Sequence, residues 1–382
     1  MPLSSTVLGN TFSSTDSLPS VGWSASPATD IVYDIAYDYY GRRVATCSSD
    51  QVVRVFEGED GHKVAEWRAH SGAIWRIAWA HPEFGVALAT CSFDRRICVW
   101  EEGTDAEEAA LAAAGGAGGS VPGWPKRAEL VDARDSVADI AFAPHHAGLR
   151  LASCGADGAV RVHDAPDVLD LGSWELQCEF DAVTGGRLGT PPEGGGRAAN
   201  AAASGGGGAT AAAAAAEGGE PLCLAWCPCI GEPPMLVVGL SDGCVALWVS
   251  GVAGWVRSRA FGPGAAHLGA VRGVAWAPDV GRSHEVIATA SSDKTTKLWN
   301  LTSAGGGYGG GEGEGEGGQA GGADGWSAVP CATLPHRSQV WRVSWNASGS
   351  LLASSEDDGT VRVFKMDPSG EWQQAKATGG RV

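Results

Sequence analysis

The chain of 382 residues lacks several features that would assign it to common functional classes. No apolar run approaches the roughly 18 residues that a membrane-spanning helix needs, so we expect no transmembrane segment. The N-terminus has no basic stretch followed by an apolar core, which argues against a secretory signal. Without that context, the ten cysteines are expected to be reduced thiols of a cytosolic or nuclear protein rather than disulfides.

Positive charge and tyrosine are also scarce. Lys and Arg number 27 against 44 Asp and Glu, which gives a formal net charge of −17. Binding to a phosphate backbone depends on clustered Lys and Arg, so we expect no direct contact with nucleic acid. Only five tyrosines accompany 16 tryptophans. This imbalance suits a fold that places a large aromatic once or twice in every repeat.

A repeated pattern runs through most of the chain and is clearest in residues 69–102. There, short stretches of alternating β-branched and aromatic side chains predict strands, and Pro82, Gly85 and Asp94 predict turns. The same pattern recurs six times, each time as an Asp that ends an apolar run and is followed six residues later by a ring. The six pairs are Asp50 with Phe56, Asp94 with Trp100, Asp157 with His163, Asp242 with Trp248, Asp293 with Trp299 and Asp358 with Phe364.

Each unit has a strand with a late aromatic before this run and a fourth strand after it. The late aromatics are Tyr37, Trp79, Phe142, Trp226, Trp276 and Trp345. Four short strands with an Asp turn and a closing ring are typical of a WD-repeat β-propeller. We therefore predict an all-β, six-bladed propeller with blades near residues 30–69, 70–132, 133–181, 221–262, 267–335 and 336–377. A leader over residues 1–29 and inserts rich in Gly, Ala or Glu over residues 103–123, 184–220 and 304–325 are expected to be disordered.

Two units bring His, Ser and Asp together, as a nucleophile–base–acid set would. They contain His70, Ser92 and Asp94, and His267, Ser291 or Ser292, and Asp293. A catalytic set would occur once, whereas this one is repeated. We therefore expect the turn aspartates to accept backbone N–H groups, and His70 with Trp100 and His267 with Trp299 to complete hydrogen-bond sets inside their blades. No catalytic or cofactor-binding residue is predicted, and the protein is expected not to be an enzyme.

The cysteines raise the possibility of a metal site. Cys223, Cys227 and Cys229 are the most closely spaced, but their spacing matches no paired C-x-x-C site. Their equal parity would place all three on one side of a strand. Three others occupy equivalent positions in successive blades: Cys47, Cys91 and Cys154. We interpret these thiols as small buried hydrophobic groups and predict no metal site.

Neither end of the chain contains a spare strand that would close the ring. Blade six could pack directly on blade one, or the ring could stay open with two apolar blade faces exposed. A partner would then cover these faces by adding strands. The sequence leaves both arrangements open. The candidate partner-facing residues are Tyr33, Ile35, Tyr37, Trp341 and Trp345.

Several segments carry a resemblance to one family of WD-repeat proteins. They are GRRVATCSSDQ, HSGAIWRIAWAHPEFG, CSFDRRICVWEE, the long stretch over residues 130–168, APDVGRSHEVIATA and SQVWRVSWNASGSLLASSEDDG. Together they touch every blade except the fourth, and they resemble the Seh-type nucleoporins, which are homologues of the Sec-thirteen coat protein. Residues 38–41 (DYYG) are similar to the Sec-thirteen protein itself. Residues 81–85 (HPEFG), 92–95 (SFDR) and 165–168 (APDV), followed by Trp174, favour the Seh type.

The resemblance implies an open six-bladed propeller whose seventh blade is donated by an α-solenoid nucleoporin of the Y-shaped subcomplex of the nuclear pore. Other nucleoporins of that subcomplex would be further partners. It also implies a scaffold role at the nuclear envelope in pore assembly, nucleocytoplasmic transport and mRNA export. Two alternatives remain: a subunit of a Sec-thirteen-like vesicle coat between the endoplasmic reticulum and the Golgi, or of a vacuolar or lysosomal coat-like complex in nutrient signalling. The inserts depart from the family pattern, so no contact of those loops is implied.

Overall fold

The computed structural model describes residues 30–58, 60–103, 123–168, 170–186, 218–230, 233–251, 254–262, 266–278, 281–282, 284–303, 325–367 and 369–379. The predicted leader and most of the three predicted inserts lie outside these residues. Among the described residues, no helix is long and apolar enough to cross a membrane. The two helices of the described part are short 3-10 turns, η1 (Pro82–Phe84) and η2 (His145–Ala147).

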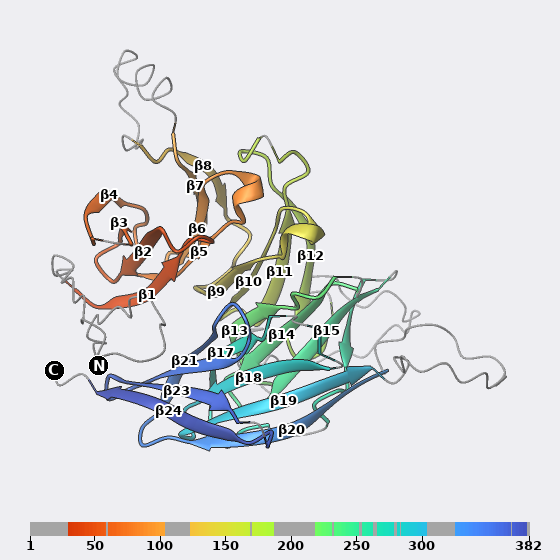
Figure 1. Ribbon diagram of the computed structural model, residues 1–382. Coiled ribbons are helices and arrows are strands. Elements are labelled where there is room, and N and C mark those ends of the chain that lie inside the picture. The colour runs from red at the N-terminus through yellow and green to blue at the C-terminus, as the bar shows by residue number, and fades with distance from the viewer. Residues whose placement is uncertain are drawn as a thin grey trace, which may run out of the picture.

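Six four-stranded antiparallel sheets form the blades of a propeller (Figure 1). Blade 1 contains β1 (Val32–Tyr37), β2 (Arg43–Ser48), β3 (Val52–Glu57) and β4 (Lys63–Arg68). Blade 2 contains β5 (Ile74–Trp79), β6 (Ala87–Ser92), β7 (Ile97–Glu101) and β8 (Lys126–Leu130). Blade 3 contains β9 (Val137–Phe142), β10 (Arg150–Gly155), β11 (Ala159–Asp164) and β12 (Glu175–Asp181).

The second half of the chain repeats this order. Blade 4 contains β13 (Pro221–Trp226), β14 (Met235–Leu240), β15 (Val245–Gly251) and β16 (Gly254–Ser258). Blade 5 contains β17 (Val271–Trp276), β18 (Glu285–Ser291), β19 (Thr295–Ser303) and β20 (Trp326–Pro335). Blade 6 contains β21 (Val340–Trp345), β22 (Leu351–Glu356), β23 (Thr360–Met366) and β24 (Trp372–Gly379). The predicted all-β, six-bladed propeller is confirmed, including the fourth blade, whose sequence carried the weakest resemblance.

The hairpin between the second and third strands of each blade is built around the turn aspartate. In all six blades its Oδ1 accepts a hydrogen bond from the backbone N–H two residues further on, at 2.9–3.2 Å. The residue between them is left-handed, with φ of 67–71° at Gln51, Arg95 and Lys294. Because side chains with a Cβ rarely adopt this conformation, the hydrogen bond to the aspartate helps to hold the turn.

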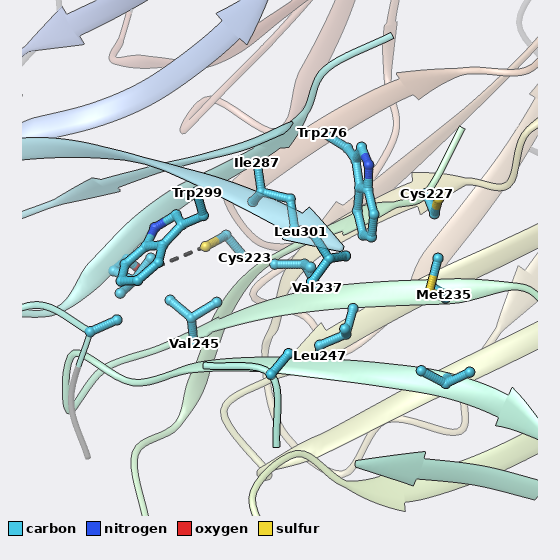
Figure 2. Packing of buried hydrophobic residues seen from close by; sticks show 14 of the residues in the cluster. Cys223, Cys227, Met235, Val237, Val245, Leu247, Trp276, Ile287, Trp299 and Leu301 are labelled. Carbon is cyan, nitrogen blue, oxygen red and sulfur yellow. Dashed lines mark hydrogen bonds between the residues drawn. The ribbon is translucent and has the colours of Figure 1, made fainter. Parts of the chain in front are cut away.

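The core lies between neighbouring blades, where the faces of two sheets pack on each other. Between blades 4 and 5, Val237 and Leu247 of one sheet and Ile287, Trp299 and Leu301 of the next belong to one buried cluster (Figure 2). All six residues of β6 and of β14 are buried, because a blade inside the array is covered on both of its faces. Five of the six residues of β2 in blade 1 are also buried.

Shortening two inserts is expected to leave the propeller intact. Gly103 N–H donates to Gly123 O at 2.9 Å, and Ser303 is paired with Trp326, so the chain already returns to its own blade at both places. Replacing residues 104–122 or 304–324 by a short Gly-Ser turn should leave the free energy of unfolding, measured in urea, unchanged within about 0.5 kcal/mol. A marked loss of cooperativity on circular dichroism would contradict this expectation.

Candidate partner-binding cleft between blades 1 and 6

The inner strands of successive blades pack on one another around the axis, but the series is not continued from the last blade to the first. Close packing joins β1 to β5, β5 to β9, β9 to β13, β13 to β17 and β17 to β21. Among the described residues, β21 and β1 do not pack in this way. A cleft of about 420 Å³ lies between them, lined by residues of β1 and of blade 6 together with Ile77 of β5. We call this space the blade 1–6 cleft.

Blade 6 is covered on one face only. Along β22, Leu352, Ser354 and Glu356 are buried, while the residues between them are half-buried. The buried face meets blade 5, where Leu352 and Phe364 belong to the shared cluster. The other face is half-buried and carries Leu351, Ala353, Ser355, Val361 and Val363, of which Ser355 and Val361 line the blade 1–6 cleft. This pattern differs from the full burial of β6 and β14 and marks a sheet with one neighbour.

Strand β1 forms the opposite wall. All six of its residues are half-buried, whereas the equivalent strand β13 has four buried residues. The two walls are joined by an ion pair between Arg342 of β21 and Asp34 of β1. The second carboxylate oxygen of Asp34 accepts the Ile77 N–H at 3.2 Å, so Asp34 ties both neighbouring blades to β1. The cleft therefore has a polar link beside apolar walls.

The same position of the inner strand carries charge in four blades. Arg76 pairs with Asp139 across blades 2 and 3 at 3.1 Å, as Arg342 pairs with Asp34 across blades 6 and 1. Burial alone lowers the pKa of Arg76, but the carboxylates of Asp139 and Asp34 raise it above the ordinary value. Sequence reasoning missed these pairs. The sequence does contain a sign of these pairs, because each charged residue lies three positions before the late aromatic of its strand.

The five candidate partner-facing residues fall in different places. Tyr33 and Ile35 line the blade 1–6 cleft. Tyr33 also lines a second pocket, bordered by residues from all six blades, which we call the channel mouth; there its ring lies beside Trp75, with ring centroids 4.7 Å apart. Trp341 lines that channel mouth, where Arg272 lies over its ring. Trp345 donates to Ala275 O at 3.2 Å and packs toward blade 5.

Tyr37 is half-buried, and burial raises the pKa of its hydroxyl. It is not among the residues that line the cleft. Of the five candidates, Tyr33 and Ile35 are therefore the two that a partner in the cleft would contact.

The His-containing sets lie inside their blades. His70 Nδ1 is 3.0 Å from Asp94 Oδ2, and its Nε2 is 2.8 Å from Thr90 Oγ1, which also accepts the Trp100 indole N–H at 3.1 Å. His267, Asp293, Thr289 and Trp299 repeat this arrangement with distances of 3.0, 2.8 and 3.0 Å. Both ring nitrogens of each histidine are occupied by the protein itself. Neither histidine is free to act as a general base toward a substrate.

The two sets share their contacts, but the histidine pKa values shift in opposite directions: burial lowers the pKa of His267 despite Asp293, whereas the pKa of His70 is raised. Burial alone lowers the pKa of His70, but its hydrogen bond to Asp94 raises that pKa to about 9. Thr90 Oγ1 donates to Cys98 O at 3.4 Å, so it is left to accept from His70 Nε2–H. Both ring nitrogens then carry protons, and His70 with Asp94 is a buried ion pair.

Two of the blades that lack this histidine, blades 1 and 3, have an arginine at the turn aspartate. Arg54 binds Asp50 at 2.7 Å, and Arg161 binds Asp157 at 2.6 Å. In blade 6 the partner of His336 is Glu356, at 3.2 Å, and the turn residue Asp358 is not its partner. Sequence reasoning missed the roles of Arg54, Arg161 and Glu356, because each lies at a different position in the repeat from the residue whose role it takes.

The cysteines divide into two groups. Burial raises the thiol pKa of three core residues on successive second strands, which keeps them protonated: Cys47, Cys91 and Cys154. Cys223 lies on β13, but that strand ends at Trp226, so strand parity does not extend to Cys227 and Cys229. These two lie beside Glu285. The pKa of the Cys229 thiol is far above its ordinary value because it hydrogen-bonds Cys227, is buried and hydrogen-bonds Glu285.

Comparison with known proteins agrees with this geometry. The model of the WD domain, G-beta repeat, matches residues 23–57, 61–101, 127–164, 264–300 and 328–365. Nucleoporin SEH1 of Xenopus tropicalis is 35% identical over an alignment of 365 residues that covers 91% of this chain and 85% of the relative. Nucleoporin SEH1 of Danio rerio is 36% identical over 369 residues (91% and 84%), and that of Homo sapiens is 35% identical over 363 residues (91% and 85%). This chain belongs to the nucleoporin SEH1 family.

Membership of the SEH1 family agrees with the resemblance carried by the sequence motifs. The matched WD repeats leave out blade 4, yet β13–β16 form the same four-stranded sheet as the other blades. This SEH1-family chain therefore keeps six blades although one of them has diverged from the repeat pattern.

Proposed function

We propose that this chain is a non-enzymatic scaffold subunit of the nuclear pore, and that the blade 1–6 cleft receives a blade-like segment of an α-solenoid nucleoporin of the Y-shaped subcomplex. In this role it supports pore assembly, nucleocytoplasmic transport and mRNA export at the nuclear envelope. The observation that carries the proposal is the one-sided burial of blade 6 along β22, together with the half-buried β1 opposite it.

The shape and chemistry of the cleft support a sheet as the occupant. Its apolar walls come from the faces of two blades, and a third sheet packed between them would restore the two-sided burial seen at β6 and β14. A segment that adds strands gains both side-chain packing and backbone hydrogen bonds. The repeated His-Asp sets support a structural role, because their nitrogen atoms are bound inside the blades. Other nucleoporins of the Y-shaped subcomplex would then join through the donated segment.

Coexpression tests the proposal. The chain produced alone is expected to be poorly soluble, because an uncovered apolar blade face favours association. Coexpression with the N-terminal region of its solenoid partner is expected to give a soluble complex of one copy of each chain, measured by size-exclusion chromatography with light scattering. A monodisperse, stable lone chain with blades 1 and 6 packed together would contradict the open-ring proposal.

Affinity purification of the tagged chain from its own cells, with mass spectrometry, tests the identity of the partner. Recovery of nucleoporins of the Y-shaped subcomplex is the expected result. Recovery of vesicle-coat subunits alone would instead favour the Sec-thirteen-like role. Recovery of only vacuolar or lysosomal coat components would favour the role in nutrient signalling.

A further inference from the structure

Three potential metal ligands meet at the interface of blades 4 and 5. The ligand atoms of Cys227, Cys229 and Glu285 all lie within 4.8 Å of one another, and no other such group is found in the part of the chain that the structure describes. Each cysteine is 6% exposed, and Glu285 is half-buried. We propose that these three side chains bind a zinc ion, and that the ion joins the two blades. The proposal is independent of the partner-binding role.

The three ligands come from the ends of strands in two sheets. Cys227 directly follows β13, and its N–H donates to Met235 O at 2.9 Å, which fixes it beside the start of β14. Glu285 is the first residue of β18 in the next blade. Figure 2 shows Cys227 separated from Cys223, whose thiol donates to Val271 O at 3.5 Å. Cys223 is therefore engaged elsewhere and provides an internal control.

Cys227 and Glu285 differ from the residues at the same repeat positions in several other blades. The residue that directly follows the late aromatic is alanine in three other blades: Ala80, Ala143 and Ala277. On the second strand of each blade, one residue pairs with the late aromatic of the first strand, and Glu285 lies two residues before that residue. Three other blades have apolar residues at this position: Val86, Leu149 and Pro234. Features shared by the blades serve the common fold. Blades 1 and 6 have polar residues at these two positions, Asp38 with Arg42 and Asn346 with Ser350, so the feature particular to this interface is a pair of thiols beside a carboxylate.

A tryptophan is diverted toward the carboxylate. In three blades the late tryptophan donates its indole N–H to a backbone carbonyl of the preceding blade: Trp79 to Ala36, Trp226 to Ala141 and Trp345 to Ala275, at 3.0–3.2 Å. Trp276 instead donates to Glu285 Oε2 at 3.1 Å. Hydrogen bonds of this kind orient metal-bound carboxylates and leave the other oxygen for the ion. The exchange gives up an inter-blade hydrogen bond at the point where a metal would join the same two blades.

The chemistry of the donor set selects the ion. A divalent cation would bind the two cysteines as thiolates and Glu285 as a carboxylate, with the thiol protons released to water on binding. Thiolates favour zinc over magnesium or calcium, which prefer oxygen ligands. Tetrahedral zinc with Zn–S bonds of about 2.3 Å places its two sulfur atoms about 3.8 Å apart, which the 4.8 Å limit of the cluster accommodates. Three protein ligands leave the fourth position to water.

Metal content tests the site. The tagged full chain is held on an affinity resin, where it cannot aggregate, washed free of partners with salt under reducing conditions without chelators, and measured by inductively coupled plasma mass spectrometry. We expect about one zinc ion per chain, falling to near none in the double variant Cys227→Ser/Cys229→Ser. Cys223→Ser, a buried cysteine four positions earlier, should retain the zinc.

A second variant and an optical probe keep the test independent of folding. Glu285→Gln retains both thiolates and should weaken zinc binding by about tenfold or more in competition with a chelator. Cobalt added to the zinc-free chain should give thiolate charge-transfer bands that are absent in the double variant and altered in Glu285→Gln. Reduced, metal-free protein that binds neither ion would overturn the proposal, and so would a Cys227–Cys229 disulfide in the isolated chain or equal zinc content in all variants.

Discussion

Replacing Asp94 by alanine is expected to lower the free energy of unfolding by about 3 kcal/mol, because it leaves a buried histidine without its charge partner. The His70 side chain is 0% exposed and that of Asp94 is 9% exposed. Asp94 also accepts the backbone N–H groups of Ser71 and Arg96, at 3.0 and 3.1 Å. Urea unfolding followed by tryptophan fluorescence measures the loss.

Asp242→Ala is the matched control for this prediction. Asp242 occupies the same turn in blade 4 and accepts the Cys244 N–H at 2.9 Å, but it is exposed, and no histidine of the described residues binds it. Its replacement should cost clearly less than that of Asp94. Equal losses in the two variants would assign the effect to the turn hydrogen bond and contradict the importance of the buried ion pair.

The ion pair also predicts a pH dependence. The pKa of His70 is raised from 6.5 to about 9 in the folded chain, so the folded state holds this proton more tightly than the unfolded state does. The resulting stabilisation is complete below pH 6.5 and is lost as the pH rises through 9. We expect the unfolding free energy of the unmodified chain to fall over this window and that of Asp94→Ala to change less.

A glutamate introduced in the blade 1–6 cleft is expected to prevent capture of the solenoid partner. Val361 of β23 is half-buried, lines the cleft and is paired with Ser355 of β22. If the proposed function holds, partner binding would bury the carboxylate of Val361→Glu in a cleft whose lining arginine, Arg342, is already paired with Asp34, which costs several kcal/mol. We expect the affinity to fall by about 100-fold or more, measured by titration calorimetry with the solenoid segment.

Val256→Glu is the control for the cleft variant. Val256 lies on β16 in blade 4, is 46% exposed and is outside the cleft, so the same substitution should leave partner binding unchanged. Ile35→Glu on the opposite wall should repeat the effect of Val361→Glu. Unchanged affinity in both cleft variants, with unchanged urea midpoints, would place the partner elsewhere on the propeller.

The repeating part of this structure could be predicted from the sequence because its causes are local. An aspartate in a tight hairpin accepts a backbone N–H two residues away wherever the turn occurs, as Asp50 and Asp358 do at opposite ends of the chain. Alternating side chains on short strands then indicate which residues face a neighbouring sheet. Six such units determine a six-bladed propeller, including the divergent blade 4.

The candidate sites depended on contacts between residues far apart in the chain, which periodicity does not report. Alternation along β22 predicts two faces, but only the ring geometry decides that one face meets blade 5 and the other borders the cleft. The ion pair of Arg342 with Asp34 joins the two ends of the array. Likewise, strand parity grouped Cys227 with Cys223, whereas β13 ends at Trp226 and the chain then turns toward Glu285 of the next blade. The sequence by itself determined the blades, because hairpin hydrogen bonds are short-range. The tertiary structure decided what covers each blade and which polar groups meet, because those contacts depend on how successive sheets are rotated around the axis.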